Sequence, residues 1–311
     1  MKIVFMGTPQ AAVPTLQKII EDGHEVLAVW TQPDKPAGRG NKLTAPPVKE
    51  FALLHNLPVL QPVKIKTEET LQLFQLHQAD VAVVVAYGRI LPESFLKAFP
   101  YGAINVHFSL LPKYRGAAPV NWAIVEGEEV TGVSTMQMDA GLDTGDILLQ
   151  REIEIGQSET SIELMERLSF IGANLLSETL KYYERLAHIP QNHKLVSYAP
   201  IMKKEDGLIN WSLSAQEITN RVCGFQPFPT SFTKLKDKKL TIWKANEVKG
   251  LRTTDNDYGK IIEAKADKLL IVCGKETILQ IDELQLAGKR RMTTRDFLNG
   301  VKLEVGEKLG Q

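Results

Sequence analysis

Residues 81–87 read Val-Ala-Val-Val-Val-Ala-Tyr, a run in which both alternating sets of side chains are apolar. Such a run predicts a β-strand that is buried on both faces, as the central strand of a parallel sheet is. Shorter apolar runs precede it at residues 2–6 and 25–31, and turn or helix signals follow each of them. We therefore expect all three runs to be strands.

Helical stretches separate these strands, and further strands follow them. Helices are predicted at residues 47–55 and 67–77, and strands at residues 57–60, 102–107, 131–138 and 147–155. Strands that alternate with helices predict a doubly wound, Rossmann-like α/β domain. The turn at residues 7–12 has one glycine where the dinucleotide-binding fingerprint needs three, so the ligand is expected at the ends of later strands.

A long amphipathic helix ends the first part of the chain. It begins at Thr160, with Glu163 at the spacing of a capping box, and apolar residues then recur at helical spacing. We predict an α/β domain over residues 1–188, an ordered linker over 189–206 and a C-terminal domain over 207–311. Short strands separated by Lys, Asp, Asn and Gly predict that the last domain is a smaller all-β, OB-like barrel.

The composition excludes several classes of protein. Of the 311 residues, 43% are hydrophobic and 24% are charged, which excludes a disordered or fibrous chain. The two cysteines, Cys223 and Cys273, exclude a disulfide scaffold, and we expect both to be buried, reduced thiols. No apolar run is long enough for a signal-peptide core or a membrane span, so a cytoplasmic protein without a membrane partner is expected.

The sequence Asn105-Val106-His107 ends one of the predicted strands. Because side chains two residues apart share a face of a strand, we expect Asn105 and His107 to lie side by side. An amide and an imidazole at the carboxyl end of a strand suit the stabilisation of an oxyanion and the transfer of a proton. The alternative is that His107 is structural and bonds a backbone carbonyl, while Asn105 merely ends the strand.

Two loops with turn residues and charges follow this strand. Residues 109–119 contain two prolines, one glycine and two cations, which predicts a rigid loop. Residues 139–146 contain three carboxylates at a spacing that does not match a calcium-binding EF-hand, and we predict no metal site. A carboxylate of the second loop would orient His107 if the fold brought the two together.

These segments resemble the formyltransferase family that uses 10-formyltetrahydrofolate. The resemblance is carried by Asn-Val-His-Phe-Ser-Leu-Leu-Pro at residues 105–112, by Arg-Gly-Ala-Ala-Pro at 115–119 and by the loop at 139–145, and it extends to residues 4–9, 198–211 and 225–229. It therefore covers nearly the whole chain. Asn210 and Gln226 depart from the family pattern, in which Asp and Asn are expected, and neither is a member of the catalytic triad.

The resemblance implies particular roles for site residues. The family's catalytic Asn, His and Asp correspond to Asn105, His107 and Asp143. The family's folate-contacting segment corresponds to Ser109, Leu110, Leu111 and Pro112. The implied reaction moves a formyl group from N10 of the folate to the α-amine of methionine carried by initiator tRNA. We expect 10-formyltetrahydrofolate as co-substrate, no metal and a monomeric enzyme.

The implied reaction needs no nucleophile from the enzyme, because the amine attacks the formyl carbon itself. This agrees with the absence of a Gly-x-Ser-x-Gly motif from the sequence. Asn105 and protonated His107 are expected to donate hydrogen bonds to the oxyanion, while Asp143 holds His107 in the right tautomer. Loss of one oxyanion donor typically costs about 3–4 kcal/mol in the barrier.

Residues 31–49 form an irregular stretch that is longer than most connections in a compact domain. One acid accompanies four cations in this stretch, namely Lys35, Arg39, Lys42 and Lys49. The resemblance identifies the stretch as a tRNA-recognition loop with its cations on phosphates, and the alternative is a disordered surface insertion. Residues 207–311 hold 18 basic and 13 acidic side chains, and we expect this domain to bind tRNA as well.

Three other functions stay open on these residues. A formyltransferase that acts on a small amine, such as a glycinamide ribotide or an amino-sugar nucleotide, would share the triad but would not need the basic loop. A hydrolase that deformylates the folate would use water in place of the amine and would need no nucleic-acid surface. An RNA-binding protein with a relic α/β domain would bind tRNA without turnover, and the intact triad argues against it.

Overall fold

The computed structural model describes the 311-residue chain except residues 38, 39, 41 and 311. The chain forms two compact units that alternate along the sequence. Unit 1 comprises Met1–Pro119, Val130–Glu154 and Met165–Ala199, and unit 2 comprises Val120–Glu129, Ile155–Leu164 and Pro200–Gln311. The division into domains at residues 188 and 207 stays a prediction.

Unit 1 is built around a seven-stranded sheet with the strand order β10-β9-β7-β6-β1-β2-β5. Strands β5, β2, β1, β6 and β7 are parallel. Strand β9 runs antiparallel to β7, and β10 runs antiparallel to β9. The bounds are β1 Lys2–Gly7, β2 Glu25–Trp30, β5 Val59–Leu60, β6 Val81–Val85, β7 Ala103–His107, β9 Val130–Gln137 and β10 Ile147–Glu154. These strands confirm the predicted doubly wound α/β fold.

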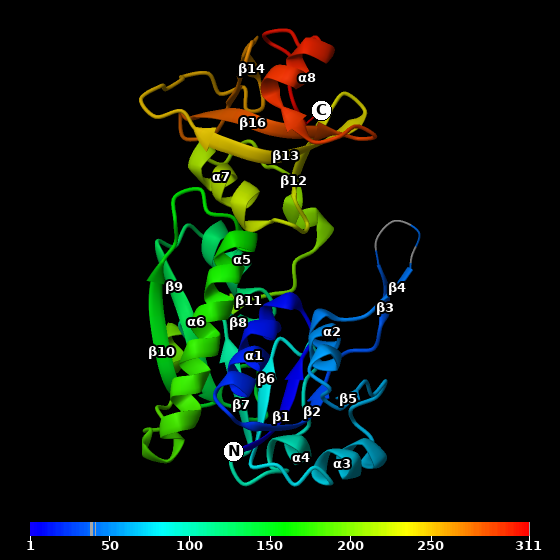
Figure 1. Cartoon of the computed structure of the whole chain (residues 1–311). Helices are drawn as coiled ribbons and strands as arrows, with labels where there is room; N and C mark the ends of the chain where they lie inside the picture. The colour runs from blue at the N-terminus through cyan, green and yellow to red at the C-terminus, as the bar shows by residue number, and fades with distance from the viewer. Residues whose placement is uncertain (38–39, 41, 311) are drawn as a thin grey trace. The chain divides into compact units, whose positions relative to one another are not determined.

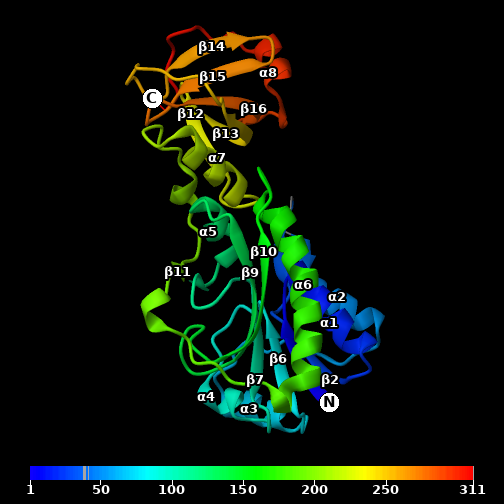
Figure 2. The ribbon, with the colours of Figure 1, turned by 90° about the vertical axis from the view of Figure 1, so that its left-hand side faces the viewer.

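Helices cover both faces of this sheet. Their bounds are α1 Val13–Glu21, α2 Pro47–Leu54, α3 Glu68–Gln75, α4 Glu93–Leu96 and α6 Ser161–Tyr182, with 3-10 helices at Gln10–Ala12, Tyr183–Arg185 and His193–Leu195. Helix α5, Pro119–Val125, belongs almost wholly to unit 2. Figures 1 and 2 show α1 and α6 on the same side of the sheet. The rings of Phe74 in α3 and Phe95 in α4 pack against Trp30 of β2 and bury the opposite face.

Helix α6 packs closely on one face of β7, and the predicted site residues lie on the other face. A Cβ atom added at Gly172 of α6 would lie 2.9 Å from Cγ1 of Val106, so a larger residue there would push the helix outward. Val106 is therefore enclosed by α6. The side chains of Asn105 and His107 alternate with it and lie on the other face of the strand.

The strand order reverses between β1 and β6, one strand away from β7. From β1 the chain moves outward to β2 and β5, then returns to β6 on the other side of β1. Ligands of open α/β sheets bind at the carboxyl ends of the strands next to such a reversal. β6 ends there at Val85 and β7 ends at His107, so the reversal and the two predicted site residues share one edge of the sheet.

The stretch at residues 31–49 is more regular than the sequence predicts. Strand β3 (Lys35–Ala37) pairs antiparallel with β4 (Lys42–Thr44). Figure 1 shows this hairpin projecting away from the sheet of unit 1. The short strands contain Pro36 and are bounded by prolines and glycine, which obscured the period of two that normally reveals a strand.

Unit 2 contains an antiparallel sheet with the order β12-β13-β16-β15-β14, and β17 pairs with β16. The bounds are β12 Ser231–Leu235, β13 Lys238–Glu247, β14 Ile261–Lys265, β15 Lys268–Val272, β16 Ile278–Leu286, β17 Met292–Thr293, α7 Ala215–Gly224 and α8 Thr294–Gly300, with a 3-10 helix at Lys204–Gly207. This sheet confirms the predicted smaller β domain. The two helices were not predicted, although Ser214 and Glu217 form a capping box at the start of α7.

Candidate active site

Asn105 is fixed at the end of β7 by the neighbouring strand. Its Nδ2 atom donates a hydrogen bond to the backbone carbonyl of Val84 in β6, at 3.0 Å. Because a carbonyl only accepts, this contact identifies the nitrogen end of the amide. The Oδ1 atom is buried and has no hydrogen-bond partner among the residues that the structure describes. A buried polar atom without a partner is the kind of group that a polar ligand satisfies.

His107 is held from the opposite side by the loop that follows the strand. The side chain is 6% exposed, and its Nε2 atom lies 3.0 Å from the carbonyl oxygen of Tyr114. Nε2 must carry a proton for this contact, since the carbonyl has none to give. The Nδ1 atom lies 3.8 Å from Oδ2 of Asp143. The ring can therefore meet reacting atoms only from the Nδ1 side.

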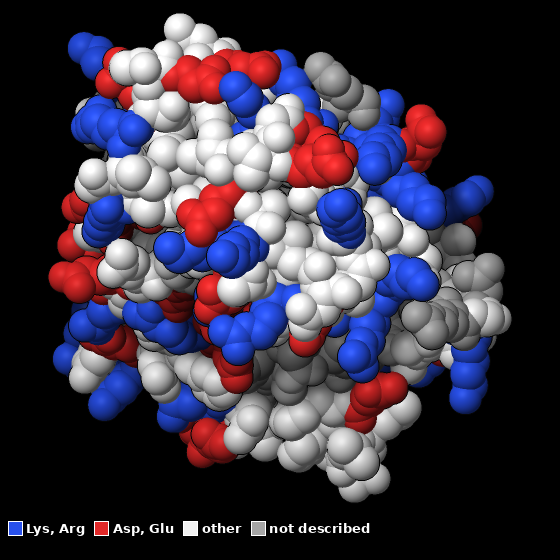
Figure 3. All heavy atoms as spheres, turned by 90° about the horizontal axis from the view of Figure 1, so that it is seen from above, with Lys and Arg blue, Asp and Glu red and all other residues white. Residues whose placement is uncertain are grey.

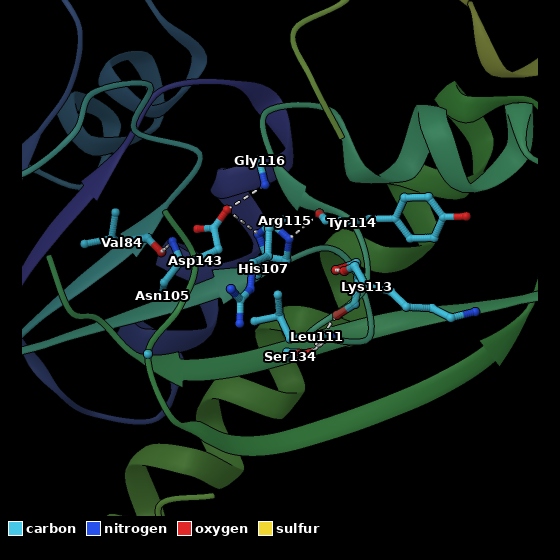
Figure 4. A network of polar contacts seen from close by, with 12 residues as sticks. Val84, Asn105, His107, Leu111, Lys113, Tyr114, Arg115, Gly116, Ser134 and Asp143 are labelled. Carbon is cyan, nitrogen blue, oxygen red and sulfur yellow. Dashed lines mark hydrogen bonds and ion pairs between the residues drawn. The ribbon is translucent and has the colours of Figure 1, made fainter. Parts of the chain in front are cut away.

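Asp143 reaches the site from the loop between β9 and β10. Its Oδ2 atom accepts a hydrogen bond of 2.8 Å from the backbone N–H of Gly116. The backbone of Asp143 has a φ of 52°. This value lies in the left-handed region, which residues other than Gly, Asn and Asp rarely adopt. Figure 4 shows the carboxylate between Gly116 and His107. The structure thus brings together the three residues of the predicted triad.

The loop after β7 supplies both of these backbone contacts. Within it, Arg115 and Gly116 form the short strand β8, which pairs in parallel with Tyr198 and Ala199 of β11. The N–H of Tyr114 also donates to Oγ of Ser197 at 2.9 Å. The segment after α6 therefore fixes the loop at 114–116, and the backbone of that loop in turn contacts His107 and Asp143.

The predicted folate-contacting segment is largely engaged with the protein itself. Ser109 is fully buried, and its Oγ donates to the carbonyl of Lys113 at 2.7 Å. Leu111 is 3% exposed, and its N–H donates to Oγ of Ser134 at 3.0 Å. Leu110 and Pro112 are half-buried. Folate contact by these four residues stays a prediction, and half of them face the protein interior.

A cavity of about 400 Å³ lies in unit 1, and the sequence did not indicate it. It is lined by residues 65–68 and 90–95, together with Leu71 and Ala140. Ala140 belongs to the same loop as Asp143, three residues away along the chain. The segment at 90–95 follows the carboxyl end of β6. Ligands of doubly wound sheets bind at such ends, so this position in the sequence could have indicated the cavity.

The four cations predicted to bind tRNA are not equivalent. Lys35 and Lys42 are exposed on the hairpin, and Arg39 lies outside the described residues. Lys49 instead donates to both carboxylate oxygens of Asp34, at 2.9 and 2.8 Å, and to Oε1 of Gln61 at 2.8 Å. The hydrogen bond from Lys49 lowers the pKa of Asp34 below its usual value. Lys49, in the first turn of α2, therefore ties the segment after the hairpin to Asp34, which directly precedes β3.

Unit 2 contains charged side chains of both signs. In the view of Figure 3, Lys and Arg side chains are interspersed with Asp and Glu. Arg291 in this unit lies over the Trp243 ring, 5.0 Å from its centroid, and pairs with Glu283 at 2.6 Å. Cation–aromatic pairs of this kind order an arginine without removing its charge.

Both cysteines are buried, and possible metal ligands do not cluster in the described part of the chain. Burial raises the pKa of Cys223 to about 11 and that of Cys273 to about 12, so both are inert thiols. No group of three or more His, Cys, Asp or Glu side chains there could hold a metal ion. Every described helix is too short or too polar to cross a lipid bilayer.

Two family models match the chain. The model described as formyl transferase matches residues 1–180, and the model of the formyl transferase C-terminal domain matches residues 201–302. With the sheet and the assembled triad, these matches define a formyltransferase. Proteins named methionyl-tRNA formyltransferase from Alkaliphilus oremlandii and Clostridioides difficile are each 48% identical to the chain, over 100% of both partners. The chain belongs to the methionyl-tRNA formyltransferase family.

Solved structures share the fold at much lower identity. WlaRD, a sugar 3N-formyl transferase, has a TM-score of 0.66 at 19% identity and covers 93% of this chain and 99% of its own. HypX from Aquifex aeolicus in complex with tetrahydrofolic acid has a TM-score of 0.65 at 16% identity, with coverage of 99% of this chain and 50% of HypX. Likeness at this level of identity establishes the fold alone.

Proposed function

We propose that the chain transfers the formyl group of 10-formyltetrahydrofolate to the α-amine of methionyl initiator tRNA. The observation that carries this proposal is the 48% identity to methionyl-tRNA formyltransferases along the full length of both chains. The product, N-formylmethionyl-tRNA, serves translation initiation, and a cytoplasmic enzyme would meet both substrates.

We place the pterin end of the donor in the cavity beside Ala140. Its volume of about 400 Å³ lies in the range of small-molecule sites. The lining combines apolar side chains such as Ile90 and Leu91 with polar groups such as Thr67, which suits a flat heteroaromatic ring with polar edges. The loop at 139–146 would then bring N10 and its formyl group toward Asp143. Leu110 and Pro112 are available to contact the remainder of the folate.

The chemistry requires that one proton leaves the amine and one reaches N10. The neutral amine attacks the formyl carbon, and the carbonyl electrons move to oxygen. As the C–N10 bond breaks, N10 takes a proton, so that a formamide and tetrahydrofolate are formed. The enzyme must therefore stabilise an oxyanion and provide a route for protons, both of which side chains near the formyl group can supply.

We propose that particular atoms carry out these tasks, and the contacts of the three residues support the proposal. Nε2 of His107 is occupied by the Tyr114 carbonyl, so the Nδ1 side handles the proton and, when protonated, donates to the oxyanion. Oδ2 of Asp143, at 3.8 Å from Nδ1, would orient the ring for this transfer. One Nδ2 hydrogen of Asn105 is bonded to Val84, which leaves the second for the oxyanion and leaves Oδ1 to accept an N–H from the amine.

The acceptor would be bound by the hairpin and by unit 2. Exposed Lys35 and Lys42 offer charges to phosphates, and the salt-dependent release of counterions would supply much of the affinity. Lys49 would contribute indirectly, because its ammonium is already bonded to Asp34. Arg39 stays a predicted contact with the acceptor stem. A small-amine acceptor would leave this surface without a use.

The test is transfer from a donor labelled in the formyl group. We expect label on methionyl initiator tRNA and none on free methionine, glycinamide ribotide or an amino-sugar nucleotide. Label released as formate without any acceptor would favour the hydrolase, and tRNA binding without transfer would favour the RNA-binding protein. Transfer to a small amine at a rate equal to or above that to tRNA would refute the proposal.

A further inference from the structure

Gln191 lies in the segment between α6 and β11, and only 5% of it is exposed. Its Nε2 atom donates to the backbone carbonyls of Asp143 and Gly145, at 2.9 and 2.7 Å. Its Oε1 atom accepts from Arg115, from Nε at 3.0 Å and from Nη2 at 2.6 Å. Because a guanidinium only donates and a carbonyl only accepts, these contacts fix the orientation of the amide. Both amide hydrogens and the oxygen are in use.

The partners of Gln191 belong to the two segments that support the triad. Arg115 is 2% exposed and lies between Tyr114, which bonds His107, and Gly116, which bonds Asp143. On the other side, Gln191 bonds the backbone of Asp143 itself. The side chain thus spans the two loops whose separation sets the distance between Asp143 and His107.

The loop that contains Asp143 receives such support. A φ of 52° lies in the left-handed region, which Asp tolerates better than most residues, and contacts to both the side chain and the backbone carbonyl fix Asp143 there. Gly116 bonds the carboxylate, and Gln191 bonds the carbonyl of the same residue. Two contacts at opposite ends of one residue resist both its rotation and its displacement.

The residue type is informative. A glutamine bonds the fork of Arg115 without neutralising its charge, and it still has two hydrogens for the carbonyls. A glutamate at this position would pair with Arg115 but would set a carboxylate oxygen against the carbonyl oxygens of Asp143 and Gly145. An apolar side chain would leave a buried guanidinium and two buried carbonyls without this partner.

We propose that Gln191 is a positioning residue for formyl transfer, which holds the Asp143 loop against Arg115 and so sets the Asp143–His107 distance. The proposal rests on the proposed function, in which Asp143 acts on His107. It assigns a part of the catalytic geometry to the segment after α6, where the sequence indicates only an ordered linker.

The main test is Gln191→Met in the full chain, because methionine has a similar length and makes none of these hydrogen bonds. We expect kcat to fall by about 10- to 100-fold, as for a misplaced catalytic group, while KM for the charged tRNA stays unchanged. Gln191→Glu keeps the fork to Arg115 and loses both donors, so it should be as slow as Gln191→Met. Wild-type kcat in Gln191→Glu would show that Gln191 serves only Arg115 and would overturn the proposal.

Gln226→Met is the matched control. Gln226 is 6% exposed, lies in unit 2 and donates through Nε2 to the carbonyls of Val222 and Trp243, at 3.0 and 3.1 Å. We expect it to lower Tm about as much as Gln191→Met and to keep kcat. An equal loss of kcat in both variants, or wild-type kcat in Gln191→Met, contradicts the proposal. If Gln191→Met does not fold, kcat of Gln191→Glu decides in the same way.

Asp143→Asn separates this proposal from the proposed function. A slow Asp143→Asn together with a fast Gln191→Met rejects the positioning role alone. Wild-type turnover in Asp143→Asn rejects the role of Asp143, and with it the catalytic mechanism on which the positioning role depends.

Discussion

Replacement of Asn105 by alanine tests the centre of the proposed mechanism. The variant loses the amide hydrogen that would stabilise the oxyanion, and such a loss typically raises the barrier by about 3–4 kcal/mol, or 10²- to 10³-fold in kcat. It also leaves the carbonyl of Val84 without its 3.0 Å partner. Loss of one intramolecular hydrogen bond typically costs about 0.5–1.5 kcal/mol of folding free energy, so a lower Tm is expected as well.

The assay must therefore separate chemistry from stability. We would measure single-turnover formyl transfer at saturating donor and tRNA, tRNA affinity by filter binding, and unfolding by circular dichroism. Thr135→Val is the matched control. Thr135 is buried in β9, where it pairs with Val106 on the face of the sheet away from the site, and its hydroxyl bonds Thr179 at 2.8 Å.

Both variants should lose stability, and only Asn105→Ala should lose the rate of transfer with tRNA affinity unchanged. A transfer rate in Asn105→Ala within threefold of the wild type would refute the assignment of Asn105 to the oxyanion. An equally slow Thr135→Val would show that the rate follows general stability, and the mechanism would have to be abandoned.

Three further predictions address other parts of the chain. Arg39→Lys should lower kcat/KM for charged tRNA by a factor equivalent to about 1–3 kcal/mol, at both low and high salt. An unchanged kcat/KM would show that Arg39 contributes only its charge and makes no directed contact. Ala140→Leu should raise KM for the folate and leave kcat nearly unchanged, because it narrows the cavity; an unaltered KM would argue against this donor site. Burial lowers the pKa of His77, whose Nε2 lies 3.3 Å from Nε1 of Trp30, so its neutral form is the one that folding favours. Neutral His77 contributes its full stabilisation at pH values above the pKa of the unfolded state, about 6.5, and this contribution is lost as the pH falls through the lower pKa of the folded state. His77→Gln should therefore flatten the dependence of the unfolding free energy on pH in that window.

The sequence predicts the main sheet well because its signals are local. The apolar run at 81–87 became β6, and the period of two placed Asn105 and His107 on one face of β7. The helices of unit 2 were missed for the opposite reason. Ser214 and Glu217 signalled the start of α7, but the strands around it dominated the pattern.

The rest of the site depends on tertiary contacts that no local pattern encodes. Three carboxylates lie in the loop at 139–146. The sequence does not indicate that Asp143, rather than either of the other two, accepts the hydrogen bond from the N–H of Gly116. Nothing near Gln191 in the sequence indicates that its side chain reaches back to that loop. The cavity, likewise, is formed by segments that are far apart in the sequence and meet only in the fold.

The contact of Lys49 with Asp34 has a consequence for how such enzymes diversify. Because this contact ties the segment after the hairpin to Asp34 outside the sheet, the segment between Asp34 and Lys49 can be lengthened, shortened or exchanged without a change in strand order. The residues proposed to carry out the transfer lie on β7 and in later loops, so the hairpin proposed to contact the acceptor is separable from them in the sequence. A hairpin grafted between Asp34 and Lys49 would therefore change the proposed acceptor surface and leave the proposed catalytic residues in place.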